Sequence, residues 1–294
     1  MPIETIKEGY ITDYISGLSV RETPEEVDAV QPFSKILVDD YGYPKGFVHT
    51  RPQYRVKARP SDRKKEYPVD IAVFSSAVHD EKSIYIIVEC KKKNRTDGRD
   101  QLEDYLRFSN ACLGVWFNGE ERLYLHKIIK DGEIQFREIP NIPRYGERLE
   151  DIGMFKRKDL RKAENLKPTF RAIRNYLAAN AVGITRDEVF ASQLINLIFC
   201  KIYDERFTKP DDTVKFRAGV NESDEDIRNR ILGLFEQVKR QYSDVIEISD
   251  SIQLDSRSIK YIVGELQLYS LKDSSRDAVG DAFEIFIGPS LKGA

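Results

Sequence analysis

Three polar residues interrupt two apolar runs near the middle of the first half of the chain. Asp70 lies in the run 67–74 (YPVDIAVF), and Glu89 and Lys91 lie at the end of the run 83–91 (SIYIIVECK). Both runs are rich in Val, Ile and Tyr, which predicts two neighbouring strands. Side chains on a strand alternate between its faces, so Glu89 and Lys91 are expected to point the same way. An isolated buried carboxylate is costly, so Asp70 inside such a strand calls for a chemical reason.

Two acids and a lysine on one face of a sheet are suited to metal-assisted hydrolysis of a phosphodiester. Carboxylate oxygens hold a hard divalent cation. Such a cation polarises the phosphate and lowers the pKa of a bound water. A lysine beside it orients or activates the water and offsets the charge that develops on the phosphate. A simpler alternative for Glu89 and Lys91 is a strand that runs out into solvent, because Lys92 and Lys93 follow.

An amphipathic helix is predicted directly after these strands, over residues 98–111. It carries Gln101 and Tyr105, which are one helical turn apart and therefore share a face. A tyrosine in such a place often serves packing alone. The order of strand, strand and helix, with polar residues on each, favours a common site over separate structural roles.

This arrangement resembles the PD-(D/E)XK nuclease superfamily. Asp70, Glu89 and Lys91 fill its D…E-x-K pattern, and Gln101 and Tyr105 fill the Q-x-x-x-Y pattern of its RecB-like and restriction-type members. The first half is similar to the N-terminal nuclease domain of type I restriction subunits, and of single-chain enzymes that fuse this nuclease to an adenine-N6 DNA methyltransferase. The family often has proline directly before the aspartate, whereas here Val69 intervenes after Pro68.

The resemblance implies roles for these residues. Asp70 and Glu89 would bind Mg²⁺, with Mn²⁺ as a substitute, and Lys91 would be catalytic. Gln101 and Tyr105 would support the site or touch DNA. A helix before the sheet often adds one more acid to the metal site in this family. Glu26 is the first candidate for that acid and Glu25 the second, while ordinary first-turn acids remain the alternative for both.

Basic residues cluster around the predicted site. The segment 51–66 is predicted to hold a strand over 53–58 and a basic loop. Such a run is often a solvated surface, but beside a metal site it also suits contact with phosphates. The residues predicted to contact DNA are Arg63, Lys64, Lys65, Lys92, Lys93 and Arg99.

The composition limits the classes of protein to which the chain can belong. The formal net charge of -2 over 294 residues gives no overall basic signature, so DNA contact would depend on a local patch. The three cysteines are scattered and predict no disulfide framework, and with three histidines a zinc site is not expected. Neither a signal peptide nor an apolar run of membrane length is present, which predicts a soluble, cytoplasmic protein.

The order of elements predicts an α/β nuclease domain over residues 1–150. A helix is expected over 23–40, with Thr23 as its cap, Pro24 in the first turn and an interruption at Pro32. Three strands, the helix at 98 and further strands after residue 111 complete the restriction-endonuclease-like αβββαβ order. Two prolines and a glycine in residues 139–150 predict a linker.

Residues 151–294 are predicted to form an all-α domain. A capping box at Thr185 and Glu188 and a cap at Ser223 mark two of its helices. The segments 194–205, 259–271 and 277–293 resemble the helical region that precedes the catalytic domain of restriction-type adenine-N6 DNA methyltransferases. The chain has no glycine-rich cofactor loop and no N/D-P-P-Y/F motif. We therefore expect a longer enzyme, in which methyltransferase and target-recognition domains follow.

Together these features predict a Mg²⁺-dependent endonuclease that acts on double-stranded DNA within a restriction-modification enzyme. Cleavage of both strands by a single site would call for a transient dimer. Two alternatives stay open. The domain could keep the fold as a catalytically silent DNA-binding or assembly module, or it could be a repair nuclease that selects branched or single-stranded DNA.

Overall fold

The computed structural model describes most of the chain as two compact units that divide between Glu147 and Arg148. The predicted contact Lys65, the predicted cap Thr185 and nearly all of the segment 277–293 lie outside the described residues. The described residues are 7–64, 66–163, 165–180, 187–244, 246–247, 249–275 and 280.

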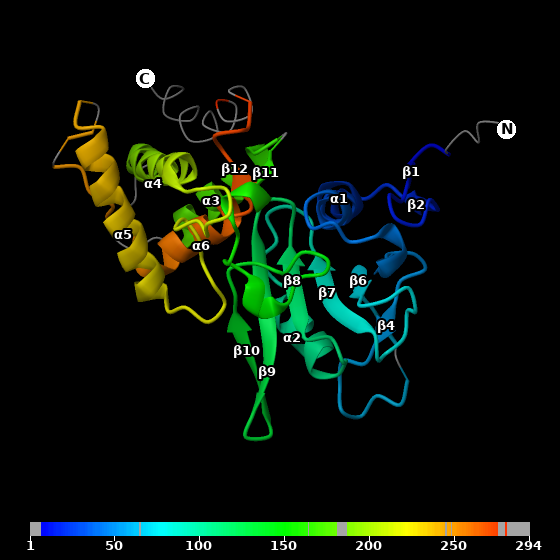
Figure 1. Cartoon of the computed structure of the whole chain (residues 1–294). Helices are drawn as coiled ribbons and strands as arrows, with labels where there is room; N and C mark the ends of the chain where they lie inside the picture. The colour runs from blue at the N-terminus through cyan, green and yellow to red at the C-terminus, as the bar shows by residue number, and fades with distance from the viewer. Residues whose placement is uncertain are drawn as a thin grey trace. The chain divides into compact units, whose positions relative to one another are not determined.

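The first unit is built on a six-stranded sheet in the order β10-β9-β8-β7-β6-β3 (Figure 1). Neighbouring strands are antiparallel except for β7 and β8, which are parallel. Helix α2 (Arg99–Arg107) provides the crossover that a parallel pair requires. The strands are β3 Val48–His49, β6 Ile71–Phe74, β7 Ile84–Cys90, β8 Leu113–Phe117, β9 Arg122–Lys130 and β10 Glu133–Glu138.

Two helices cover opposite faces of this sheet. Phe117 of β8 packs against Phe33 of α1, with ring centroids 5.0 Å apart. The next positions along β8 face the other way, where Trp116 shares a buried cluster with Leu102 and Tyr105 of α2. Gly114 belongs to this second face, since an added Cβ would lie 2.6 Å from Leu106 Cδ1. Successive side chains of β8 therefore point alternately toward α1 and toward α2.

The helix before the sheet begins where the sequence predicted. The Thr23 hydroxyl accepts a hydrogen bond from the backbone N–H of Glu26 at 3.2 Å, and helical residues start at Pro24. The segment η1 (Glu26–Val30) is π-helical and leads into α1 (Gln31–Asp39). Pro32 has no N–H to donate to the preceding turn, which explains why the regular α-helical pattern is interrupted here.

The predicted strand around Asp70 is divided in two. Tyr67–Pro68 forms β5, which pairs with β4 (Arg55–Val56) in a separate two-stranded arm, and Asp70 lies just before β6. The strand predicted over 53–58 is therefore shorter and outside the main sheet, where β3 takes its place. A proline at residue 68 favours this break, because it cannot donate to a central ladder.

The predicted linker over 139–150 is partly buried within the first unit. Ile139, Asn141 and Ile142 are almost inaccessible to solvent. The Tyr41 hydroxyl donates to the Asn141 side chain, and the Tyr43 hydroxyl donates to the carbonyl of Pro143 at 3.0 Å. The prolines here end the sheet without starting a flexible segment.

The second unit is mainly helical around its own apolar core. The Ser223 hydroxyl caps α5 by accepting from the N–H of Asp226 at 3.1 Å, as predicted. A parallel pair of two-residue strands, β11 (Arg161–Lys162) and β12 (Tyr269–Ser270), departs from the all-α expectation. The helices are α3 Lys167–Asn180, α4 Asp187–Phe207, α5 Asp224–Gln241 and α6 Ser256–Leu266. Among the described residues, none of the helices combines the length and apolar character needed to cross a membrane.

Candidate active site

Asp70 and Glu89 lie opposite each other on adjacent strands. The register pairs Ile71 with Val88 in antiparallel fashion, which places the preceding Asp70 across from the following Glu89. Asp70 Oδ2 accepts a hydrogen bond from the Cys90 backbone N–H at 2.7 Å, and its Oδ1 lies 3.4 Å from Gln53 Nε2. Glu89 is 2% exposed. The break in the strand thus leaves the Asp70 carboxylate held against the end of β7.

Lys91 links these acids to helix α2. Its Nζ contacts Glu89 Oε1 and lies 3.3 Å from Gln101 Oε1. The Gln101 amide in turn donates to the Tyr105 hydroxyl at 2.6 Å. The structure therefore brings together the five residues predicted for catalysis, on the face of the sheet that α2 covers.

Gly98 makes room for the Lys91 side chain, and the sequence analysis did not single it out. It has a φ of +104°, and a Cβ at this position would lie 2.6 Å from Lys91 Cε and 3.2 Å from Trp116 Nε1. Glycine adopts such a φ readily. Gly98 therefore both starts α2 and leaves the space through which Lys91 reaches Glu89.

Burial and neighbouring negative charge disfavour the ionised form of the two acids at this site. Burial raises the pKa of Glu89, and the nearby Asp70 carboxylate raises it further. Burial also raises the pKa of Asp70, against the opposing effect of the Cys90 N–H, and the Glu25 carboxylate adds to the increase. Burial lowers the pKa of Lys91, but its contact with Glu89 outweighs this, so the pKa is raised and the amine stays charged.

These features fit a hard divalent cation. Two buried carboxylates that disfavour each other's ionised form would be relieved by a positive charge between them. Mg²⁺ is commonly held by one or two carboxylates, with water and substrate phosphate completing its coordination. Within the described part of the chain, no three His, Cys, Asp or Glu side chains are grouped so that they could hold a metal ion.

The acids before the sheet differ in their surroundings. Glu26 is buried and binds Arg51 Nη2 at 2.5 Å, while its other oxygen accepts from Gln31 Nε2 at 2.7 Å. Glu25, the second candidate, is instead the acid whose charge raises the pKa of both Asp70 and Glu89. Glu26 is thus occupied by neighbouring side chains, and the Glu25 charge acts on the acid pair.

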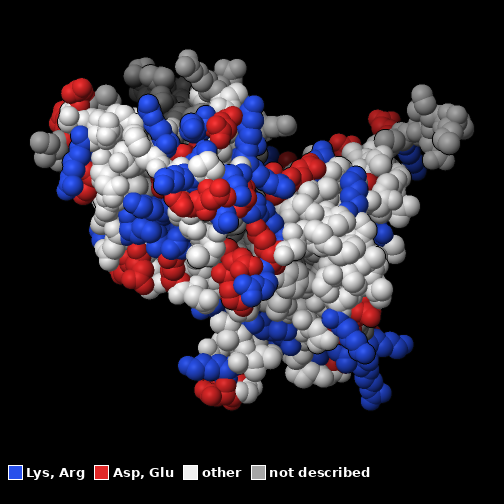
Figure 2. Space-filling model, viewed as in Figure 1, with Lys and Arg blue, Asp and Glu red and all other residues white. Residues whose placement is uncertain are grey.

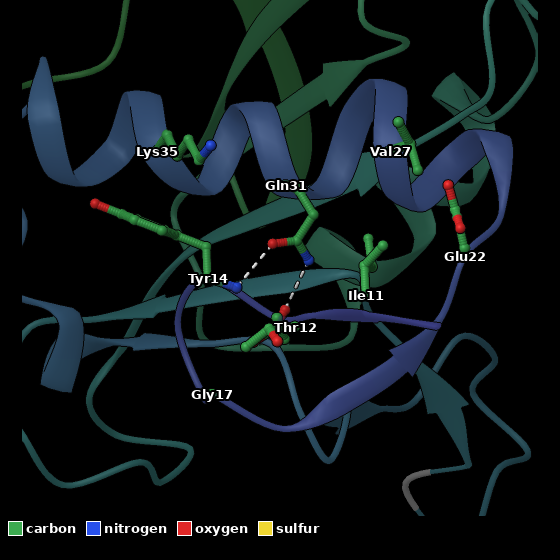
Figure 3. Close-up of a pocket in the computed structure, with 9 residues that line it drawn as sticks. Ile11, Thr12, Tyr14, Gly17, Glu22, Val27, Gln31 and Lys35 are labelled. Carbon is green, nitrogen blue, oxygen red and sulfur yellow. Dashed lines mark hydrogen bonds between the residues drawn. The ribbon is translucent and has the colours of Figure 1, made fainter. Parts of the chain in front are cut away.

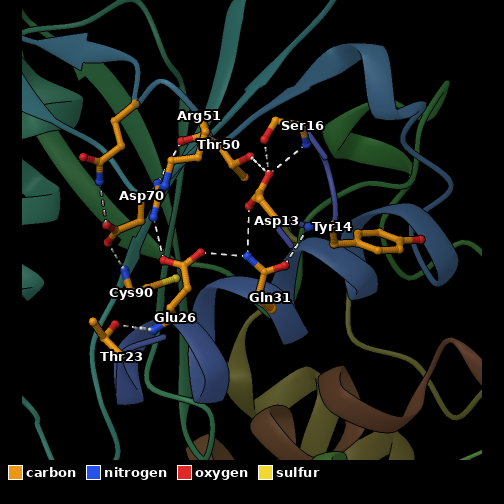
Figure 4. Close-up of polar contacts among 11 residues, drawn as sticks. Asp13, Tyr14, Ser16, Thr23, Glu26, Gln31, Thr50, Arg51, Asp70 and Cys90 are labelled. Atoms are coloured by element: carbon orange, nitrogen blue, oxygen red, sulfur yellow. Dashed lines mark hydrogen bonds and ion pairs between the residues drawn. The ribbon is translucent and has the colours of Figure 1, made fainter. Parts of the chain in front are cut away.

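A chain of polar contacts connects the site to the N-terminal hairpin, β1 (Tyr10–Thr12) and β2 (Ser19–Arg21) (Figure 4). Asp13 is fully buried and accepts from Gln31 Nε2 at 2.9 Å and from the Thr50 hydroxyl at 2.6 Å. Gln31 continues to Glu26 and Glu26 to Arg51, whose charge lowers the pKa of Asp70. Arg51 was recognised from the sequence only as one of many basic residues.

A pocket of about 550 Å³ opens between this hairpin and the helix η1–α1 (Figure 3). Gln31 and Asp13 line it, whereas Asp70, Glu89 and Lys91 do not. Its other lining residues are Ile11, Thr12, Tyr14, Gly17, Glu22, Val27 and Lys35. The pocket is therefore a feature separate from the acid pair.

The residues predicted to contact DNA differ in their exposure and in whether an acid of the same unit binds them. Arg63 and Lys64 are exposed on the loop between β4 and β5, and Figure 2 shows basic side chains projecting in this region. Lys92 is also exposed. Lys93 Nζ lies 3.1 Å from Asp28 Oδ1, and Arg99 binds Glu103 at 3.1 Å and Glu138 at 2.8 Å. Lys93 and Arg99 are thus engaged with acids of the same unit, whereas the arm and Lys92 are exposed.

Comparison with known proteins gives one finding for the first unit. Residues 24–143 match the family model of the type I restriction enzyme R protein N terminus. The matched range contains the acid pair, Lys91, Gln101 and Tyr105, and it ends before the second unit begins. No curated protein matches the chain. The first unit is therefore similar to the N-terminal region of type I restriction enzyme R proteins.

Proposed function

We propose that the first unit is a metal-dependent DNA endonuclease of the restriction type, with the αβββαβ fold of the PD-(D/E)XK superfamily. The observation that carries this proposal is the convergence of Asp70, Glu89 and Lys91 on one face of the sheet, inside the region similar to restriction R subunits. The order of α1, β3, β6, β7, α2 and β8 along the chain supports it.

Asp70 and Glu89 would hold Mg²⁺ or Mn²⁺ through their carboxylate oxygens. When bound, the cation supplies Lewis-acid polarisation of the phosphate and an acidified water. Two further groups of the chain favour the binding of the cation and the phosphate. The Cys90 N–H orients Asp70, and the position of Arg51 beside both Glu26 and Asp70 adds positive charge where a phosphate would approach. Glu25 would add to the negative potential that attracts the cation, while water and a substrate phosphate would complete its coordination.

Lys91 acts as a cation in this proposal. Its raised pKa keeps the amine protonated, so it donates hydrogen bonds and does not accept a proton in this state. A charged amine beside Glu89 can orient the attacking water and stabilise negative charge on the phosphate. Gln101 holds Lys91 in place through its side-chain oxygen, and Tyr105 orients Gln101.

The proposed substrate is double-stranded DNA. The arm β4–β5 and Lys92 would contact its phosphates, which positions the duplex but does not read its sequence. We further propose that the second unit couples this nuclease to methyltransferase and target-recognition domains of a longer, cytoplasmic enzyme. That part of the proposal rests on the resemblance of the segments 194–205 and 259–271.

Plasmid nicking with Mg²⁺ or Mn²⁺ tests the nuclease directly. The native chain is compared with Asp70→Ala and Lys91→Ala, and with Asp104→Ala as the control, because Asp104 is exposed on helix α2. We expect metal-dependent nicking that both site variants abolish and the control retains. Unchanged nicking by either site variant, with the fold intact by circular dichroism, would contradict the assignment.

The same samples separate the alternative functions. DNA binding without metal-dependent cleavage, in this chain and in any longer form of the protein, would favour a silent binding module. Cleavage that depends on branched or single-stranded structure would favour a repair nuclease.

A further inference from the structure

Two histidines meet at the edge of the main sheet. His49 ends β3, and His79 lies in the turn between β6 and β7. Their Nδ1 atoms are 2.9 Å apart, and the two rings are nearly perpendicular, with an interplanar angle of 81°. Thirty residues of chain separate them, so only the fold makes them neighbours.

The other ring nitrogen of each histidine faces a backbone carbonyl. His79 Nε2 is 2.8 Å from the carbonyl oxygen of Gly46, and His49 Nε2 contacts the carbonyl oxygen of Pro52. A carbonyl oxygen only accepts hydrogen bonds, so each Nε2 must carry the proton. A neutral imidazole has one N–H, and each Nδ1 is then a bare lone pair.

With both rings neutral, two lone pairs face each other across 2.9 Å and repel. A positive charge shared by the two Nδ1 atoms relieves this repulsion, and either a proton or a metal ion can supply it. Metal-binding histidines in proteins show this same pattern, in which the nitrogen that does not bind the metal donates to a backbone carbonyl and fixes the tautomer. Two imidazoles bound tetrahedrally to zinc at about 2.0–2.1 Å have nitrogens about 3.3 Å apart, so a small opening of the pair would admit the ion.

Aromatic packing holds the rings in this position. His79 stacks on Phe74 with centroids 4.4 Å apart, and His49 meets the edges of Phe74 and Tyr54. Oδ1 of the neighbouring Asp80 already accepts from the Ser83 N–H at 2.8 Å and from the Lys82 N–H at 3.0 Å. His79 is exposed and His49 is half-buried, so water would complete the coordination.

We propose that His49 and His79 bind one divalent cation of the zinc class through their Nδ1 atoms. The ion would join β3 to the β6–β7 turn. Strand β3 pairs with β6 through two residues only, and it is followed directly by Thr50 and Arg51, which belong to the polar chain leading to Asp70. The site would thus be a structural clamp on the strand that positions Arg51, and it is distinct from the proposed Mg²⁺ site.

Zn²⁺ titration of the full chain tests this proposal. The Asp70→Asn, Glu89→Gln double variant serves as the background, so that the acid pair does not contribute. In it we compare His49→Gln and His79→Gln with His126→Gln, which removes the third histidine instead. We expect one Zn²⁺ to bind by calorimetry, with at least tenfold weaker binding in the first two variants and unchanged binding in the third.

Imidazole NMR gives a readout that does not depend on stability. Zn²⁺ should shift the ring resonances of His49 and His79, leave those of His126 in place, and be reversed by a chelator. His79 lies on an exposed turn, so His79→Gln is expected to fold. Equal Zn²⁺ affinity in all variants, or ring resonances that respond to pH but not to Zn²⁺, would overturn the proposal and would leave the nuclease assignment untouched.

Discussion

Each unit contains a buried glutamate, and the neighbours of the two glutamates differ. Glu205 in the helical unit is 2% exposed, as is Glu89 in the first unit. Glu205 binds Lys201 Nζ at 3.0 Å and also accepts from the N–H groups of Leu271 and Lys272. Its neighbour Asp204 accepts from two further backbone N–H groups and a threonine hydroxyl.

In the first unit the acid is placed beside another acid. Glu89 has Asp70 across the strand pair, and the charge of Asp70 raises its pKa. The helical unit thus uses buried acids to tie chain segments together, since their oxygens are satisfied by donors. The first unit keeps a repulsion that a cation would relieve, which is the expected difference between a structural acid and a functional one.

Substitution of each glutamate by glutamine should therefore differ in its cost. Glu205→Gln leaves Lys201 buried without its partner, and we expect the second unit to lose about 3–5 kcal/mol of stability. Glu89→Gln removes the partner of Lys91, but it also removes one of two repelling acids and leaves Asp70 nearby to balance the lysine, so the first unit without metal should lose clearly less. Urea denaturation followed by helical circular dichroism measures the first effect, and the fluorescence of Trp116 measures the second. Equal destabilisation by both would remove the distinction.

The placement of Lys91 can be disturbed without changing any charge. Gly98→Ala puts a Cβ 2.6 Å from Lys91 Cε, so we expect nicking to fall about 10- to 100-fold, or about 1.4–2.7 kcal/mol in the barrier. Gly132→Ala is the matched control, because Gly132 also has a positive φ of +82° but has open space around it. Initial nicking rates at saturating metal compare the two. A similar loss in both would mean that backbone strain, and not Lys91, causes the effect.

The acid pair should make stability depend on pH and on metal. Because the folded state raises the pKa of both acids, it holds protons that the unfolded chain releases, and stability falls as the pH rises above the ordinary carboxyl range. Mg²⁺ should restore this loss at alkaline pH, by about 1.4 kcal/mol at a concentration tenfold above its Kd. Melting temperatures with and without Mg²⁺ measure it, and Asp70→Asn should show no Mg²⁺ response. A response that persists in this variant would place the metal elsewhere.

The smallest effect is expected at Tyr105. Tyr105→Phe keeps the buried ring but removes the hydroxyl that accepts from Gln101 at 2.6 Å. Since Tyr105 acts on Lys91 only through Gln101, nicking should fall less than about tenfold, which corresponds to one neutral hydrogen bond of about 0.5–1.5 kcal/mol. Gln101→Ala, which removes the direct contact with Lys91, should cost more in the same assay. The reverse order would give Tyr105 a direct role.

The sequence by itself determined which residues share a face and in which order the elements follow. Alternation along the strand placed Glu89 and Lys91 together, and helical spacing placed Gln101 and Tyr105 together, because both depend only on local geometry. The caps at Thr23 and Ser223 are also local, and the structure contains both.

Contacts between distant segments were decided by the tertiary structure alone. The position of the Asp70 carboxylate depends on a hydrogen bond from β7, and the fit of Gly98 depends on a side chain from another element. The approach of His49 Nδ1 to His79 Nδ1 joins residues 30 positions apart in the sequence, and two backbone carbonyls orient the rings. Residue types and spacing set local conformation, whereas the partners of a buried acid or a histidine are set by packing of the whole unit.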